Sequence, residues 1–244
     1  MDSALLMLSI TELTDRLGHG MVRPARALAC YLHRNDTRMQ RANLPRTPYI
    51  EHPLRNTLRL LRWSVTDEVT LTAALLHDTV EDEAFELAST FANDPTDDEE
   101  QARVIAFAYL AGAFSPEVAT AVRHMSNPIT PAGLPRSRRV DQYIEHVRQE
   151  LTDPRFVLLK ATDLVDNAAG LRHNVDWADP TTIGNDKARN LAAKYEQPVA
   201  IITGRLRDVD EKLHALLPDE GRERAITQLL TATKYLDGIR IFLS

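Results

Sequence analysis

The chain has 244 residues, of which 43% are hydrophobic and 26% are charged, and its formal net charge is −6 at pH 7. This composition is typical of a globular protein with a substantial core, and its acidity excludes a general attraction for nucleic acid or for anionic membranes. The single cysteine, Cys30, excludes an internal disulfide and a multi-cysteine zinc site.

The N-terminal stretch MDSALLMLSI has no basic region before its apolar residues and no small-residue cleavage site after them. No uninterrupted apolar run in the chain approaches the roughly 20 residues that span a bilayer. We therefore expect a cytoplasmic protein without a signal peptide.

Helical spacing of apolar residues dominates the chain, and no convincing period-two alternation indicates a strand. Ser64 and Asp67 resemble a capping box at the start of one helix, and Ser115 precedes a proline at the start of another. An apolar stripe from residue 191 to 216 predicts a long helix, which Pro198 should kink or divide into two. The sequence therefore predicts an all-α fold.

The segment AALLHDTVEDE places five ionisable side chains at the end of an apolar run. Residues four apart share a face of a helix, so His77 should lie over Glu81 and Asp78 over Asp82. A divalent cation would offset the cost of gathering these charges, and imidazole with carboxylate suits Mn, Fe or Zn. The alternative is a frayed helix end with solvated acids, and a His-Asp pair alone favours that interpretation.

Two further segments change this balance. TPYIEHP places His52 directly before a proline, and LLKATDLVDNAAGLR places Lys160, Asp163 and Asn167 on one face of a second apolar helix. Alone, His52 would be a structural histidine, and Asp163 would be an ion partner of Lys160 or of an arginine. Together the three segments supply two histidines and two aspartates, enough to bind one ion and leave positions for water and substrate.

The ordered set YIEHP, LLHDTVEDE and KATDLVDN resembles the HD-domain metal-dependent phosphohydrolases, most closely the hydrolase domain of RelA/SpoT homologues. The resemblance covers roughly residues 20 to 210. It implies an HD-domain helical bundle over residues 1–210, with residues 211–244 as a C-terminal helical extension packed on the same domain.

The resemblance also implies roles for individual residues. Glu81 and Asp82 would position or deprotonate the attacking water, and Asn167 would face the ribose or the scissile phosphate of the substrate. We expect Glu83 and Asp166 to face away as solvated charges, and the sequence assigns no chemistry to the histidines outside the motifs. The implied ligands of one divalent ion, usually Mn²⁺ in this family, are His52, His77, Asp78 and Asp163.

The segment QRANLPRTPYI departs from the family's arginine-lysine-x-glycine-x-proline pattern, because its basic residues are displaced and the glycine is missing. We expect Arg41 and Arg46 to contact the substrate together with Asn167 and Lys187, although base recognition should differ. The base of the nucleotide stays open, as does the choice between Glu81 and Asp82 as the principal proton acceptor.

A stand-alone small alarmone hydrolase fits these observations, because no synthetase half fits after position 210. We expect it to remove the 3'-pyrophosphate of (p)ppGpp or a relative such as ppApp, without nucleic-acid or membrane partners. Two alternatives remain: another phosphorylated nucleotide, such as the 2'-phosphate of NADPH, and an antitoxin that binds a toxic alarmone synthetase. The sequence does not indicate the oligomeric state.

Overall fold

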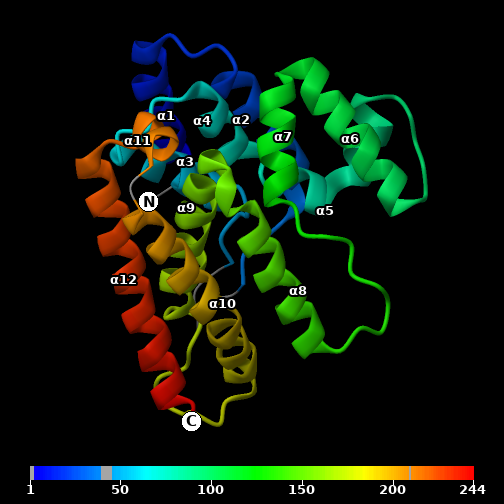
Figure 1. The fold of residues 1–244 in the computed structure, drawn as a ribbon. Coiled ribbons are helices and arrows are strands. Elements are labelled where there is room, and N and C mark those ends of the chain that lie inside the picture. Colours follow the sequence, from blue (N-terminus) through cyan, green and yellow to red (C-terminus); the bar gives the residue numbers. More distant parts are fainter. Residues whose placement is uncertain (1–2, 40–45, 209) are drawn as a thin grey trace. The chain divides into compact units, whose positions relative to one another are not determined.

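The computed structural model describes residues 3–39, 46–208 and 210–244, which form helices and loops without a β-strand (Figure 1). The prediction of an all-α fold is confirmed. Contacts divide the chain into a first unit, Met1–Asp36 with Pro48–Leu134, and a second unit, Thr37–Thr47 with Pro135–Ser244. Among the described residues, no helix combines the length and the apolar character that crossing a membrane requires.

The first unit is built around α4, which packs against α2, α3 and α7. Every residue of α4 from Thr70 to Leu76 is buried, which explains why this helix is apolar on all sides. Its helices are α1 (Ser3–Leu17), α2 (Val22–Leu32), the 3-10 helix η1 (His33–Asn35), α3 (Glu51–Arg62), α4 (Glu68–Leu76), α5 (Thr79–Glu86), the π-helix η2 (Leu87–Phe91), α6 (Glu99–Ala113) and α7 (Pro116–Met125).

The second unit is built around α9, against which α10, α11 and α12 pack. Figure 1 shows α9, α10 and α12 side by side. The predicted C-terminal extension forms α11 and α12 of this unit, while the domain boundary at residue 210 stays a prediction. Its helices are α8 (Arg136–Gln149), the 3-10 helix η3 (Glu150–Thr152), α9 (Pro154–Leu171), α10 (Ile183–Arg207), α11 (Glu211–Leu216) and α12 (Asp219–Phe242).

Side chains at the helix starts confirm one predicted cap and correct another. Ser115 Oγ accepts a hydrogen bond from the Val118 backbone N–H at 3.2 Å, so the predicted start of α7 is confirmed. At the start of α4 the cap is Asp67, whose carboxylate accepts from the Thr70 N–H at 2.9 Å. Ser64 lies in the preceding turn with φ +65°, so its predicted capping role is wrong.

The long apolar stripe is divided, but not at Pro198. Helix α10 continues through this proline to Arg207, and α11 begins after Asp210, whose carboxylate accepts from the Leu213 N–H at 2.8 Å. The interior proline removes one helical hydrogen bond, and packing of α10 on α9 and α12 offsets this loss. Val209, also part of the stripe, lies outside the described residues.

Candidate metal centre

Three predicted ligands converge in the first unit. His52 Nε2 lies 3.2 Å from His77 Nε2, and Asp78 Oδ2 lies 3.1 Å from His77 Nε2 and 3.5 Å from His52 Nε2. Two atoms that bind one cation at about 2.1 Å are about 3.0–3.4 Å apart at octahedral or tetrahedral angles. His52, His77 and Asp78 therefore already have the spacing of ligands to a single ion.

The tautomer of His77 is determined by its backbone contact. Its Nδ1 lies 2.9 Å from the Ala74 carbonyl oxygen, which can only accept, so Nδ1 carries the hydrogen and donates it. The other ring nitrogen, Nε2, faces His52, which is buried with only 1% of its surface exposed. Two ring nitrogens that face each other at 3.2 Å need a proton or a cation between them.

Asp78 is held as a carboxylate. Burial would raise its pKa, but the charges of His77 and His52 and the hydrogen bonds from His77 and Tyr49 hold this pKa well below its ordinary value. The Tyr49 hydroxyl donates to Asp78 Oδ2 at 2.7 Å. A fixed carboxylate beside two imidazoles is a donor set that fits a divalent cation such as Mn²⁺, Fe²⁺ or Zn²⁺.

The backbone around His77 differs from the predicted continuous helix. Helix α4 ends at Leu76 and α5 begins at Thr79, so His77 and Asp78 occupy the junction between two helices. Glu81 and Asp82 consequently lie in the first turn of α5, where the helix dipole favours acids. The backbone N–H of Asp82 still donates to the Asp78 carbonyl at 2.9 Å, as predicted for residues one turn apart.

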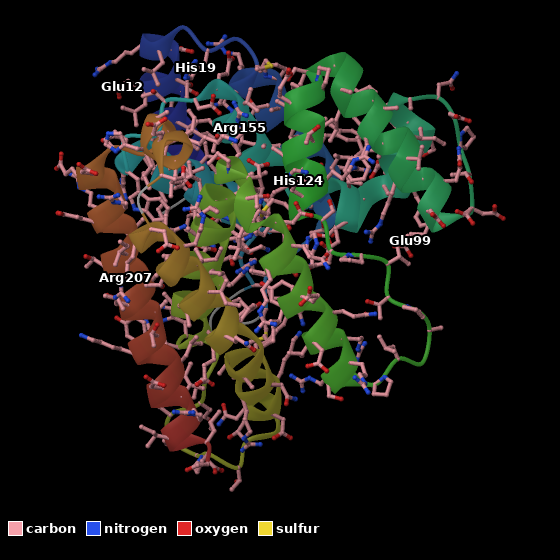
Figure 2. The ribbon with its side chains drawn as sticks, in the orientation of Figure 1. Glu12, His19, Glu99, His124, Arg155 and Arg207 are labelled. Carbon is pink, nitrogen blue, oxygen red and sulfur yellow. The ribbon has the colours of Figure 1, made fainter. Side chains whose placement is uncertain are left out.

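Glu81 is fixed by a residue far along the chain. Its carboxylate accepts from the Asn127 backbone N–H at 3.0 Å and from the Asn127 side-chain amide at 3.0 and 3.1 Å. Arg103 donates to the Asn127 carbonyl at 2.6 Å and pairs with Glu99, labelled in Figure 2, at 2.9 Å. The sequence motifs missed Asn127, because a single asparagine in the loop after α7 gives no signal.

Asp82 has a different environment from Glu81. Partial removal from water, and then the neighbouring carboxylates of Asp78 and Glu81, raise the pKa of Asp82 to about 7. Its side chain is exposed and makes no hydrogen bond within the described part of the chain. A carboxylate with a pKa near 7 is suited to accept a proton at neutral pH.

Asp163, the fourth predicted ligand, lies in the second unit within a network of that unit. Its carboxylate accepts from Lys160 Nζ at 3.3 Å and from Asn167 Nδ2 at 2.6 Å, so the predicted common helix face is confirmed. Asn167 Oδ1 accepts in turn from Arg38 at 2.8 Å. Within this unit, the ion pair with Lys160 matches the alternative interpretation of Asp163.

Arg38 and Asp166 were not predicted as parts of this network. Asp166 is buried and pairs with Arg38 at 3.6 Å, so the prediction that Asp166 is a solvated charge is wrong. A buried carboxylate on an apolar helix needs such a partner. Arg38 precedes the segment QRANLPR, and its position in the sequence alone does not indicate a partner on α9.

The other predicted substrate contacts are three basic residues. Arg46 and Lys187 are exposed, and Lys187 lies on the first turns of α10. Arg41 lies outside the described residues. Their role in binding a substrate stays a prediction.

An all-α fold with two buried histidines and an adjacent, partly exposed aspartate is an arrangement that suits a metal-dependent hydrolase. More particularly, residues 49–168 match the HD domain family, and this match supports an HD-domain metal-dependent phosphohydrolase. The matched segment includes all four predicted ligands, from His52 to Asp163. A comparison with curated proteins found no match.

Proposed function

We propose that the protein is a Mn²⁺-dependent hydrolase that releases pyrophosphate from the 3' position of (p)ppGpp or a related alarmone such as ppApp. The observation that carries this proposal is the donor cluster of His52, His77 and Asp78. These residues belong to sequence motifs whose order along the chain resembles that of the RelA/SpoT hydrolase domain.

In this proposal the metal is held by His52, His77 and Asp78, with Asp163 as a further ligand. The inclusion of Asp163 rests on its place in the motif KATDLVDN and on the span of the HD domain match. A divalent cation bound by these residues supplies Lewis acidity toward a phosphoryl oxygen and lowers the pKa of water.

Two acids of α5, Glu81 and Asp82, act on the attacking water. Water attacks the phosphorus atom attached to the ribose O3', the P–O3' bond breaks, and O3' takes a proton from solvent. Asp82 accepts the proton of the water, because its pKa near 7 suits transfer at neutral pH. Glu81, fixed by Asn127, orients the same water. The products are GDP or GTP, or their adenine equivalents, and pyrophosphate.

Cationic and amide side chains would bind the phosphates and the ribose in an otherwise acidic protein. Asn167 would exchange one of its bonds, to Arg38 or to Asp163, for a bond to the substrate. The proposed substrate contacts are Arg41, Arg46, Asn167 and Lys187.

The test is product analysis on ppGpp, ppApp and NADPH with protein of measured metal content, with and without Mn²⁺. We expect pyrophosphate from at least one alarmone, only with metal bound. No pyrophosphate from any alarmone at full metal occupancy would contradict the proposal, and phosphate release from NADPH would favour the other nucleotide substrate.

An antitoxin that acts by binding is separated from a hydrolase by the Asp78→Ala variant. Under the proposed function this variant no longer protects cells from a toxic alarmone synthetase. Full protection by Asp78→Ala, with no hydrolysis in vitro, would indicate direct binding of the synthetase instead.

A further inference from the structure

A second group of ligand-type side chains converges in the first unit, outside the cluster of His52, His77 and Asp78. His33, Asp36 and Glu83 each bring one ligand atom within 4.8 Å of the other two. His33 Nδ1 lies 2.9 Å from Asp36 Oδ2, close to the separation of two atoms that share one cation. The sequence assigned no chemistry to His33 and predicted Glu83 to be a solvated charge.

His33 is buried in the first unit, and the polar contact of its ring comes from this group. Its ring is 1% exposed, and Nε2 is buried without a hydrogen-bond partner among the described residues. The contact of Nδ1 with Asp36 is therefore the only polar contact of the ring in the described part of the chain. A fully buried imidazole whose Nδ1 contacts one carboxylate, with a second carboxylate within 4.8 Å of the group, is placed as a metal ligand would be.

The two carboxylates lie near one cationic side chain, Arg34, which acts on Glu83 through its charge but donates its hydrogen bonds elsewhere. The nearby guanidinium of Arg34 pairs with Glu86 instead, through contacts of 2.8 and 3.1 Å. Within the described residues, neither Asp36 nor Glu83 forms an ion pair with lysine or arginine. The backbone of α5 departs from helical geometry at Glu83, with φ −130° and ψ 27°. Two carboxylates gathered without a paired lysine or arginine are costly, and a divalent cation removes that cost.

Tyr49 separates this group from the candidate metal centre. Its ring centroid lies 4.7 Å from that of His33 and 5.8 Å from that of His52, and its hydroxyl donates to Asp78. The two groups share no ligand, so an ion in one does not require an ion in the other.

We propose that His33, Asp36 and Glu83 form a second divalent-cation site. One imidazole nitrogen and two carboxylate oxygens suit Mn²⁺, Fe²⁺ or Zn²⁺, and water completes the coordination. The site binds its ion more weakly than the first, because Asp36 and Glu83 are partly exposed. An ion there fixes the ring of Tyr49 from one side and the middle of α5 from the other.

The test is a titration of chelator-stripped protein with Mn²⁺ alone, in which electron paramagnetic resonance counts bound and free ions. Wild type should bind two ions, His77→Ala should lose the tighter one, and Asp36→Asn with Glu83→Gln should lose the weaker one. The matched control Glu86→Gln, on the same helix, should retain both ions.

Two outcomes would overturn the second site. One is a wild-type protein that binds a single ion, and this result needs no variant. The other is a folded Asp36→Asn, Glu83→Gln protein that still binds two ions. Because the readout is stoichiometry without nucleotide, failure here is distinct from failure of the proposed hydrolysis, which the product assay reports.

Discussion

The donor cluster of the first unit and the Asp163 network of the second unit each hold a carboxylate that is largely removed from water, but the two carboxylates have different partners. Asp78 faces two imidazole nitrogens at 3.1 and 3.5 Å, the spacing of ligands to a single cation. Asp163 already accepts from the ammonium of Lys160 and the amide of Asn167. A short motif thus identifies a carboxylate on or beside an apolar helix, but the neighbouring cation decides whether a metal is needed.

The largest expected effect comes from breaking the first cluster. His77→Ala removes the ligand nitrogen of a ring that the Ala74 carbonyl holds in place through Nδ1. We therefore expect loss of tight Mn²⁺ binding and at least about a thousand-fold lower turnover. Metal content and turnover of the folded variant measure this. The control His214→Ala changes an exposed histidine on α11 and should retain both, whereas full metal content in His77→Ala would exclude this cluster as the metal centre.

The next effect decides the role of Asp163. If Asp163 is a ligand, Asp163→Asn should weaken Mn²⁺ binding by about a hundred-fold, which an equilibrium titration measures. The matched control is Asp166→Asn on the same helix, whose carboxylate pairs with Arg38. Unchanged Mn²⁺ affinity in Asp163→Asn would show that this aspartate serves only the network of Lys160 and Asn167.

A smaller effect is expected where a neutral contact orients an acid. Asn127→Ala removes the side-chain bonds to Glu81, and the loss of about 1–2 kcal/mol should lower kcat roughly ten-fold without changing Mn²⁺ affinity. Steady-state kinetics at saturating metal check this, with the exposed Ile129→Ala in the same loop as the control. An unchanged kcat would mean that the orientation of Glu81 does not limit the reaction.

The smallest effect is the pH dependence of metal-free stability. The folded pKa of Asp82 is raised from 3.8 to about 7, so the folded state keeps a proton that the unfolded chain releases. This contribution is present below about pH 3.8 and is lost as the pH rises toward about 7. The Tm of Asp82→Asn should therefore fall less than the Tm of wild type as the pH rises over that range. We expect a difference of about 1–2 °C, which allows for the exposure of the side chain.

Thermal melts of metal-free protein at pH 5 and pH 8 measure this difference. Glu86→Gln is the control, because the Glu86 carboxylate is paired with Arg34. An equal pH dependence of Tm in wild type and Asp82→Asn would show that Asp82 titrates normally.

The local features of the fold were predictable because they depend on spacing along one segment. Ser115 caps α7, and Lys160, Asp163 and Asn167 share a face of α9, as helical geometry requires. The predicted cap at Ser64 was wrong because Ser64 and Asp67 are both candidate caps within one turn. Only the backbone geometry shows that Asp67 is the cap of α4.

Contacts between distant segments were not predictable from patterns. Asn127 reaches Glu81 across 46 residues, and Arg38 reaches Asn167 across 129. Glu83 contributes to the second group because the backbone departs from helical geometry at its position, which no spacing rule anticipates.

The sequence by itself determined the all-α class and the pairing of His77 with Asp78, since hydrophobic periodicity and adjacency act within a few residues. Only the tertiary structure decided that the helix breaks at His77 and Asp78, which moves Glu81 and Asp82 from a helix end to a helix start. The tertiary structure also decided which carboxylates have a cationic side chain as a partner and which could bind a metal ion. These pairings depend on packing between helices that are far apart in the chain.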